Sequence, residues 1–138
     1  MTLERTPFFA RVMGVILGIE STAHTFSFGG VYTNGETIPS SSALFRPEQG
    51  GIHPREAADH HSLLSGNLFK EFISKNQIPV NQIDAIAFSQ GPGLGPCLRV
   101  GASVARSLSD KMGKPLVGVN HCVAHIEIGR LQTGRSEE

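Results

Sequence analysis

The sequence is poor in cysteine, in net charge and in long apolar runs. It has two cysteines in 138 residues, Cys97 and Cys122, which are too few for a disulfide framework. Twelve basic residues balance twelve acidic ones, so no overall field draws the chain to nucleic acid or to an anionic membrane. No apolar run approaches the ~20 residues that span a bilayer. These absences favour a cytoplasmic protein with no membrane contact, and any contact with nucleic acid must be local or shared.

What remains is typical of one globular domain. With 138 residues and 39% hydrophobic side chains, the chain can bury one core and is too short for two ordinary domains. Residues 1–12 lack the apolar core of a secretory signal, and Met13 could serve as a start codon, so we expect a disordered or vector-derived extension there. We expect one folded lobe over residues 13–130 and a frayed end at 131–138, which suggests truncation.

Three extended segments come first. Val15–Glu20 is apolar and rich in β-branched residues, which is typical of a strand buried on both faces. Two further extended runs follow, His24–Tyr32 and Glu36–Leu44, with Asn34-Gly35 between them. Asn-Gly between extended segments indicates a hairpin, because both residues tolerate positive φ. The chain is therefore expected to begin as an antiparallel meander.

The apolar period then changes to that of a helix. After a turn that places proline at a first helical position, Arg55–Lys75 carries apolar residues at helical spacing. Ile83–Ser89 indicates a buried strand, Pro96–Met112 a second helix that stops at a glycine and a proline, and Leu116–Val119 a fifth strand. Asn120 can cap a third helix. This order predicts an α/β fold with a mixed five-stranded sheet and right-handed crossovers.

Two histidines lie one helical turn apart directly after the fifth strand. On a helix, His121 and His125 project from one face at i and i+4 and can share a cation. Histidines at this spacing also arise by chance on protein surfaces, but open α/β sheets place their ligands just beyond the carboxyl ends of strands. A metallopeptidase would place a glutamate after the first histidine, where this sequence has Cys122. The pattern favours a metal site without a hydrolytic base.

A loop rich in glycine and proline, residues 90–101 (QGPGLGPCLRVG), joins the fourth strand to the second helix. It fits neither the dinucleotide fingerprint nor the phosphate loop, because Pro96 takes the place of the final glycine and no Gly-Lys-Ser/Thr follows. Such a loop either presents backbone amides to an anion or lets the helix pack closely on the sheet. We favour the packing role, and Arg99 is the residue that would support contact with an anion.

Five further polar residues are candidates for contact with a substrate or a phosphate: Glu20, Ser21, Thr22, His53 and Glu56. The first three end the first strand, and an acidic residue followed by hydroxyls resembles the phosphate-contacting turn of actin-like ATPases, although serine and threonine are also ordinary turn residues. The other two lie at the turn before the long helix. His60 and His61, within that helix, are interpreted as surface or boundary residues.

Four segments together resemble motifs of the tRNA threonylcarbamoyladenosine transferase family, in the family's order. They are residues 18–22 (GIEST), 50–58 (GGIHPREAA), 90–101 and 120–125 (NHCVAH). The sequences of the last two segments are similar to those of archaeal and eukaryotic members, in which the protein is the catalytic subunit of the KEOPS complex. The resemblance implies an actin/Hsp70-like (ASKHA, ribonuclease H-like) fold of two lobes, of which this chain is the N-terminal one.

The resemblance implies a metal-dependent reaction. A threonylcarbamoyl group moves from its adenylate to the adenosine beside the anticodon of tRNA, and one divalent ion orients the substrate and polarises the carbonyl group. The ion would be iron or zinc, with magnesium as an alternative, held by His121, His125 and an aspartate of the missing second lobe, while Cys122 packs inward. The full-length protein would also bind an adenine nucleotide or threonylcarbamoyl-adenylate. We assign no catalytic residue and expect this chain alone to be inactive.

The helices carry more apolar surface than packing on one sheet requires. The apolar arc of the long helix covers roughly half of its circumference, and packing on a sheet needs about 100°. In the resembling family a small dimerising KEOPS subunit docks on these two helices, and the kinase subunit and tRNA bind the full-length protein. We expect the docking contact at Leu63, Phe69, Ile73, Leu108 and Met112. Aspartate at Phe69 or Ile73 is expected to weaken docking without unfolding the chain.

Two other functions are open. The chain could be a non-catalytic module that binds a partner subunit, and a comparison of the activities of full-length and truncated protein would separate this function from that of a transferase lobe. A metalloprotease is disfavoured because the sequence has no catalytic base beside His121.

Overall fold

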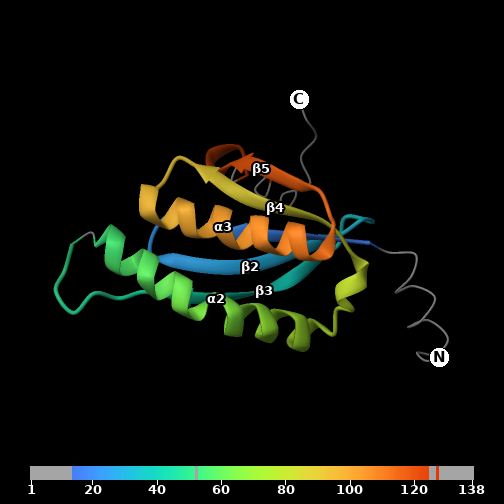
Figure 1. Cartoon of the computed structure of the whole chain (residues 1–138), viewed down its shortest axis with the longest axis horizontal. Coiled ribbons are helices and arrows are strands. Elements are labelled where there is room, and N and C mark those ends of the chain that lie inside the picture. Colours follow the sequence, from blue (N-terminus) through green and yellow to red (C-terminus); the bar gives the residue numbers. More distant parts are fainter. Residues whose placement is uncertain (1–13, 52, 125–126, 128–138) are drawn as a thin grey trace.

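Five strands form one mixed sheet: β1 (Val15–Glu20), β2 (Thr25–Tyr32), β3 (Thr37–Leu44), β4 (Ile83–Gly91) and β5 (Leu116–Asn120). The computed structural model describes residues 14–51, 53–124 and 127. The spatial order of the strands is β3-β2-β1-β4-β5 (Figure 1). β1 and β2 pair antiparallel, as do β2 and β3, whereas β4 runs parallel to β1 and β5 parallel to β4. The predicted meander followed by parallel crossovers is confirmed.

The turn between β2 and β3 is the predicted Asn-Gly hairpin. Gly35 has a φ of 95°, which a residue without Cβ adopts easily, and its N–H donates to the carbonyl of Tyr32 at 2.8 Å. The side-chain oxygen of Asn34 accepts the N–H of Glu36 at 3.0 Å. The turn therefore fixes the pairing register of the two strands, and with it the set of side chains that faces the core.

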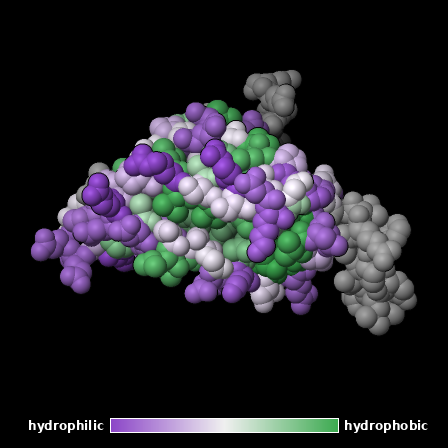
Figure 2. All heavy atoms as spheres, in the orientation of Figure 1, coloured by the Kyte–Doolittle hydropathy of each residue, from purple (hydrophilic) through white to green (hydrophobic). Residues whose placement is uncertain are grey.

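Two helices cover one face of the sheet (Figure 1). α2 (Pro54–Asn76) packs on β2 and β3, and α3 (Gly95–Met112) packs on β4 and on α2. α2 ends at Gln77 with a φ of 52° and α3 at Gly113 with a φ of 65°, the left-handed conformation that commonly ends helices. Each observed helix end lies within one residue of its predicted end. Figure 2 shows hydrophobic residues interspersed with polar ones on the outer surface of this layer.

The hydrophobic core lies between the two helices and the sheet. Leu17 of β1, Phe26 and Phe28 of β2, Phe72 of α2 and Ile86 of β4 are fully buried. The rings of Phe28 and Phe72 lie 6.4 Å apart between their centroids and join α2 to the middle of the sheet. Because truncation of such a buried phenylalanine to alanine costs about 3–5 kcal/mol, these rings fix the position of the long helix.

The prediction that β1 is buried on both faces is wrong. Val15, Leu17 and Ile19 are buried beneath the helices, whereas the alternate residues of the strand are partly exposed on the opposite face. That face borders a groove of about 560 Å³. Because α2 and α3 cover the same side, the described part of the chain leaves the other side of the sheet partly open.

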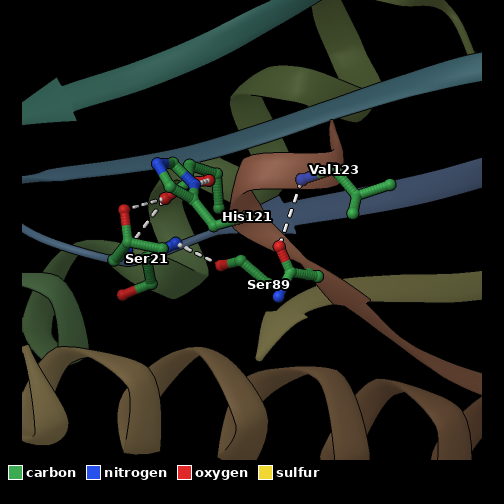
Figure 3. A network of polar contacts seen from close by, with 7 residues as sticks. Ser21, Ser89, His121 and Val123 are labelled. Atoms are coloured by element: carbon green, nitrogen blue, oxygen red, sulfur yellow. Dashed lines mark hydrogen bonds and ion pairs between the residues drawn. The ribbon is translucent and has the colours of Figure 1, made fainter. Parts of the chain in front are cut away.

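A third helix begins after β5, as the sequence predicts. Residues 121–124 and 127 are helical. The side-chain oxygen of Asn120 accepts the N–H of Val123 at 3.1 Å, which is the bond of a helix N-cap (Figure 3). The cap turns the chain at the end of β5, so that His121 stands at the first position of the new helix.

Some predictions concern segments that the structure does not describe. The expected extension at residues 1–12 and the frayed end at 131–138 both lie outside the described residues. Within the described ranges, none of the helices combines the length and the apolarity needed to cross a bilayer. The cytoplasmic location stays a prediction.

Candidate functional site

The carboxyl ends of three parallel strands meet at one edge of the sheet and bring together polar residues that are distant in sequence (Figure 3). Glu20 ends β1, Ser89 lies near the end of β4, and His121 follows β5. Ligands of open α/β sheets bind at this edge. All three residues also line the groove of about 560 Å³ on the open face of the sheet. This edge is the candidate site.

Glu20 and His121 contact each other directly. Nδ1 of His121 lies 3.1 Å from Oε2 of Glu20, with side-chain exposures of 25% for the histidine and 39% for the glutamate. A carboxylate oxygen only accepts hydrogen bonds, so Nδ1 carries the proton and donates it. In the neutral imidazole the second nitrogen, Nε2, is then the one that can bind a metal. Sequence reasoning singled out both residues but did not pair them.

The turn after β1 holds the other carboxylate oxygen of Glu20. Oε1 accepts the N–H of Thr22 at 2.8 Å and its hydroxyl at 2.6 Å. The N–H of Ser21 donates to Oγ of Ser89 at 3.2 Å, and the hydroxyl of Ser21 donates to the carbonyl of Cys97 at 2.9 Å. The donors of Ser21 and Thr22 are thus engaged within the protein, and a phosphate contact through them would require these bonds to break.

Ser89 was missed by the sequence analysis. It is the polar residue at the end of the fourth strand, directly before the glycine-rich loop. Its position at a strand end, opposite the Glu20 turn, is the signal that could have identified it, because the carboxyl ends of neighbouring parallel strands meet at one edge of a sheet.

The glycine-rich loop packs closely on the turn after β1. A Cβ at Gly93 would lie 2.6 Å from the carbonyl oxygen of Thr22, and a Cβ at Gly101 would lie 2.9 Å from Cβ of Ser21. The N–H of Leu94 donates to the same Thr22 carbonyl at 2.7 Å. These contacts support the packing role of the loop over direct contact with a ligand.

Arg99, His53 and Glu56 do not line the groove that contains Glu20 and His121. Arg99 lies on α3 and lines a smaller groove of about 370 Å³ between α2 and α3, together with Arg55. Nδ1 of His53 lies 3.6 Å from Oε2 of Glu56 at the start of α2. Their contact with a substrate or a phosphate stays a prediction.

The two cysteines have opposite environments. Cys122 is exposed, so the prediction that it packs inward is wrong: it stands in the first turn of a helix that faces solvent at this position. Cys97 is fully buried in α3, where burial raises the pKa of its thiol. Its Sγ lies 3.8 Å from the carbonyl oxygen of Pro54 and donates to it, which ties α3 to the start of α2.

His61 is fully buried, which corrects its interpretation as a surface or boundary residue. It occupies the same helical stripe as Ala57, Leu68 and Phe72, all of which are buried on the core side of α2. His60, its neighbour, is partly buried and lies against the ring of Phe45 at 5.3 Å between centroids. Burial lowers the pKa of both imidazoles.

The second predicted metal ligand, His125, lies outside the described residues. Among the described residues no group of three or more histidine, cysteine, aspartate and glutamate side chains is placed to hold a metal ion. The pairing of His121 with His125 therefore stays a prediction.

The residues of the predicted docking contact differ in exposure. Leu63 is 82% exposed on α2. Phe69 and Ile73 are partly buried against the core, as are Leu108 and Met112 of α3. The ring of Phe69 lies 5.4 Å from that of Phe28 between centroids. Leu63 is thus the member of the set that is open to a partner without a role in the core.

The strand order and the helices on one face give the chain a fold of the ribonuclease H-like, or ASKHA, class. YeaZ from Pseudomonas aeruginosa is similar with a TM-score of 0.62 and 18% identity, over 78% of this chain and 43% of that one. T. thermophilus RuvC in complex with a Holliday junction substrate is similar with a TM-score of 0.50 and 11% identity, over 79% of this chain and 66% of that one. These similarities concern the fold alone.

The chain belongs to the tRNA N6-adenosine threonylcarbamoyltransferase family, whose profile matches residues 36–138. The tRNA N6-adenosine threonylcarbamoyltransferase of Caldivirga maquilingensis is 55% identical over 124 residues, which are 89% of this chain and 37% of that protein. That of Thermofilum pendens is 51% identical over 119 residues, 86% of this chain and 35% of that protein.

A protein of Methanocaldococcus jannaschii described as a probable bifunctional tRNA threonylcarbamoyladenosine biosynthesis protein is 51% identical over 119 residues, 86% of this chain and 22% of its own length. The chain thus spans between about a fifth and two fifths of the lengths of these three relatives.

Proposed function

We propose that this chain is the N-terminal lobe of a metal-dependent transferase that moves a threonylcarbamoyl group from threonylcarbamoyl-adenylate to the adenosine beside the anticodon of tRNA. Family membership and the names of the relatives support the reaction. The observation that supports this location of the site is the contact between Glu20 and His121 at the carboxyl edge of the sheet. In this proposal the site lies between two lobes, so the reaction requires a second lobe.

In this proposal, His121 and His125 hold one divalent ion, and an aspartate of the second lobe completes the protein ligands. The donor set fits such an ion, because a metal-binding histidine typically donates its other ring nitrogen to a carboxylate, as His121 does to Glu20. Imidazole ligands suit iron and zinc better than magnesium. When bound, the ion supplies a Lewis acid for the carbonyl group under attack.

The residues of this chain have positioning roles in the proposed reaction. Glu20 fixes the ring orientation of His121, and Thr22 fixes Glu20 through two hydrogen bonds to one oxygen. Ser21 and Ser89 join the turn to β4. An adenine nucleotide or the adenylate would bind between this lobe and the second one. We propose no general base among the residues of this chain.

Partner docking is the second candidate function, and it does not exclude the first. The observation that favours it is Leu63, a large apolar side chain with 82% exposure on α2. We propose that a small dimerising KEOPS subunit packs on α2 and α3, which lie on the face of the sheet opposite the groove that His121 lines. The kinase subunit and tRNA would bind the full-length protein.

The reaction is tested with a chimera in which this chain replaces the matching segment of the Caldivirga relative, which is 55% identical over 124 residues. With threonylcarbamoyl-adenylate, tRNA and the partner subunits, the chimera is expected to form threonylcarbamoyladenosine, measured by mass spectrometry of digested tRNA. His121→Ala should lower the rate by more than about 100-fold, beyond the usual effect of an outer-shell change. Glu36→Gln, on the exposed hairpin between β2 and β3, is the control. A chimera without activity, or with equal activity in both variants, would contradict the proposal.

A further inference from the structure

The buried His61 of α2 contacts the turn that holds Glu20. Its Nε2 lies 2.7 Å from the carbonyl oxygen of Ala23, and its Nδ1 lies 3.1 Å from Nδ1 of His60. The side chain has 0% exposure, and its ring centroid is 5.5 Å from that of Phe26 in the core. A polar side chain buried in this way costs stability unless its polar atoms are hydrogen-bonded.

The partners of His61 determine its protonation state. A carbonyl oxygen accepts hydrogen bonds and cannot donate, so Nε2 carries the proton and donates it to Ala23. Burial lowers the pKa of His61; the hydrogen bond to the Ala23 carbonyl raises it by less, and the neighbouring His60 and His24 lower it further. The neutral ring therefore accepts at Nδ1, and the hydrogen atom in that contact comes from Nδ1 of His60. The result is a directed chain from His60 to His61 to the Ala23 carbonyl.

The turn between β1 and β2 is held by three different segments through three consecutive carbonyl groups. The carbonyl of Thr22 accepts the N–H of Leu94 at 2.7 Å, and that of His24 accepts the N–H of Phe45 at 2.8 Å. The carbonyl between them, that of Ala23, accepts from His61. His61 supplies the contact from the long helix. Without it, the middle of the turn would lose its attachment to α2, and the Ala23 carbonyl would lose this hydrogen bond.

We propose that His61 is a positioning residue for the candidate site. Its Nε2–H holds the turn so that Thr22 presents its N–H and hydroxyl to Glu20, and Glu20 in turn keeps its other oxygen against His121. His61 lies behind the turn, at Ala23, and acts only through it. The relevance of this role to catalysis rests on the proposed function, whereas the role itself is a property of the isolated chain.

A matched pair of amide variants tests the role. The amide nitrogen of glutamine can occupy the place of Nε2 in histidine, whereas that of asparagine corresponds to Nδ1 and cannot reach the Ala23 carbonyl. In His61→Asn, hydrogen exchange of the Thr22 and Leu94 amides, measured by NMR, should accelerate by about tenfold. In His61→Gln it should stay within about twofold of the parent. Equal exchange in both variants and the parent would overturn the proposal.

The ring nitrogens of His121 give a second readout that a purely local packing role of His61 would not change. In the parent, nitrogen chemical shifts should show a proton on Nδ1 of His121; His61→Asn should shift this pattern toward a mixture of tautomers, and His61→Gln should restore it. An unchanged pattern in His61→Asn would also overturn the proposal. A parent chain that shows these effects but binds no divalent metal would contradict the proposed function and leave the role of His61 intact.

The parent protein provides a test that does not depend on the folding of a variant. Its His61 must carry the proton on Nε2 at neutral pH, since Nε2 faces the Ala23 carbonyl. Nitrogen chemical shifts of the His61 ring that place the proton on Nδ1 would contradict the directed hydrogen-bond chain and, with it, the proposal.

Discussion

Oε2 of Glu20 lies 3.1 Å from Nδ1 of His121, and the two residues are separated by 101 positions in the chain. The contact joins the end of β1 to the start of the helix after β5, across β4. One carboxylate thereby links the turn after β1, through Thr22, to the first histidine of the proposed metal pair. Replacement of Glu20 should therefore lower the affinity for the metal although no metal ligand is removed.

Glu20→Gln should weaken binding of Zn²⁺ to the chain by about 10–100-fold, the usual effect of replacing an outer-shell partner of a metal-bound histidine. The glutamine keeps the size of the side chain but removes the charge that orients the ring. Isothermal titration measures the affinity. Glu36→Gln, on the exposed hairpin after β2, is the matched control for the change of charge. Identical affinities for the two variants would contradict the outer-shell role of Glu20.

Two glycine-to-alanine substitutions on helices should change stability in opposite directions. At Gly101 the new Cβ would lie 2.9 Å from Cβ of Ser21, and such overpacking costs about 1–3 kcal/mol. At Gly66 no atom lies within 4 Å of the new Cβ, and alanine there should stabilise α2 by about 0.5–1 kcal/mol. Urea unfolding of both variants measures the difference. A Gly101→Ala variant as stable as Gly66→Ala would show that α3 does not pack tightly on the turn.

Stability should fall as the pH is lowered from about 7 through the region below 6.5. Burial lowers the folded-state pKa of His61 and His60 beneath the ordinary value of 6.5, so the unfolded chain binds more protons in that interval. The contribution of the neutral rings is fully present above 6.5 and is lost toward the lowered pKa values. The groups that face His61 in this effect are His60 and His24, both cationic when protonated.

Chemical denaturation at several pH values checks this dependence. His61→Gln retains the hydrogen bond to Ala23 but does not titrate, so the free energy of unfolding of this variant should change less with pH than that of the parent. A variant whose stability depends on pH as steeply as that of the parent would exclude His61 as a source of the effect.

Leu63→Asp should weaken docking of the small dimerising subunit by about tenfold or more and leave the stability of the chain within about 0.5 kcal/mol. Leu63 is 82% exposed, so the charge stays in water until the partner covers it. Calorimetry with the partner subunit measures the affinity, and Val80→Asp, at a 45% exposed position beyond the end of α2, is the control. Unchanged binding of Leu63→Asp would place the partner elsewhere.

Phe69 is unsuited to that test, contrary to the expectation from the sequence. Its ring contacts Phe28 in the core at 5.4 Å between centroids, and Ile73 also packs on the core. Aspartate at either position would bring a charge against buried apolar side chains, so weaker docking could not be separated from lost stability.

Local patterns were sufficient to predict the strands and the long helices of the fold, whereas the short 3-10 helix Val80–Gln82 was not predicted. The Asn-Gly turn at residues 34 and 35 and the proline and glycine signals at the helix ends depend on neighbours in sequence, and each observed helix end lies within one residue of its prediction. The open face of β1 was not predicted, because an apolar strand has the same sequence pattern whether one of its faces or both are covered. What covers a face depends on segments far along the chain.

The contacts of the candidate site could be predicted only in part. Glu20 and His121 were both identified from their places at strand ends, but their pairing depends on the strand order, which brings β1 and β5 to either side of β4. The burial of His61 had a signal that was overlooked: it falls four residues after Ala57 and seven before Leu68, on the apolar stripe of the long helix. The position of Cys122 had no such signal.

The most direct test of the metal site is to titrate the chain and two histidine variants with Zn²⁺ and to measure the affinities by isothermal titration calorimetry. His121→Ala should weaken Zn²⁺ binding by more than about 100-fold, because it removes a ligand and not only an outer-shell partner. His53→Ala, a histidine paired with Glu56 at another turn, should bind as the parent does. Equal affinities of the parent and His121→Ala would contradict the assignment of the metal to the edge where Glu20 meets His121.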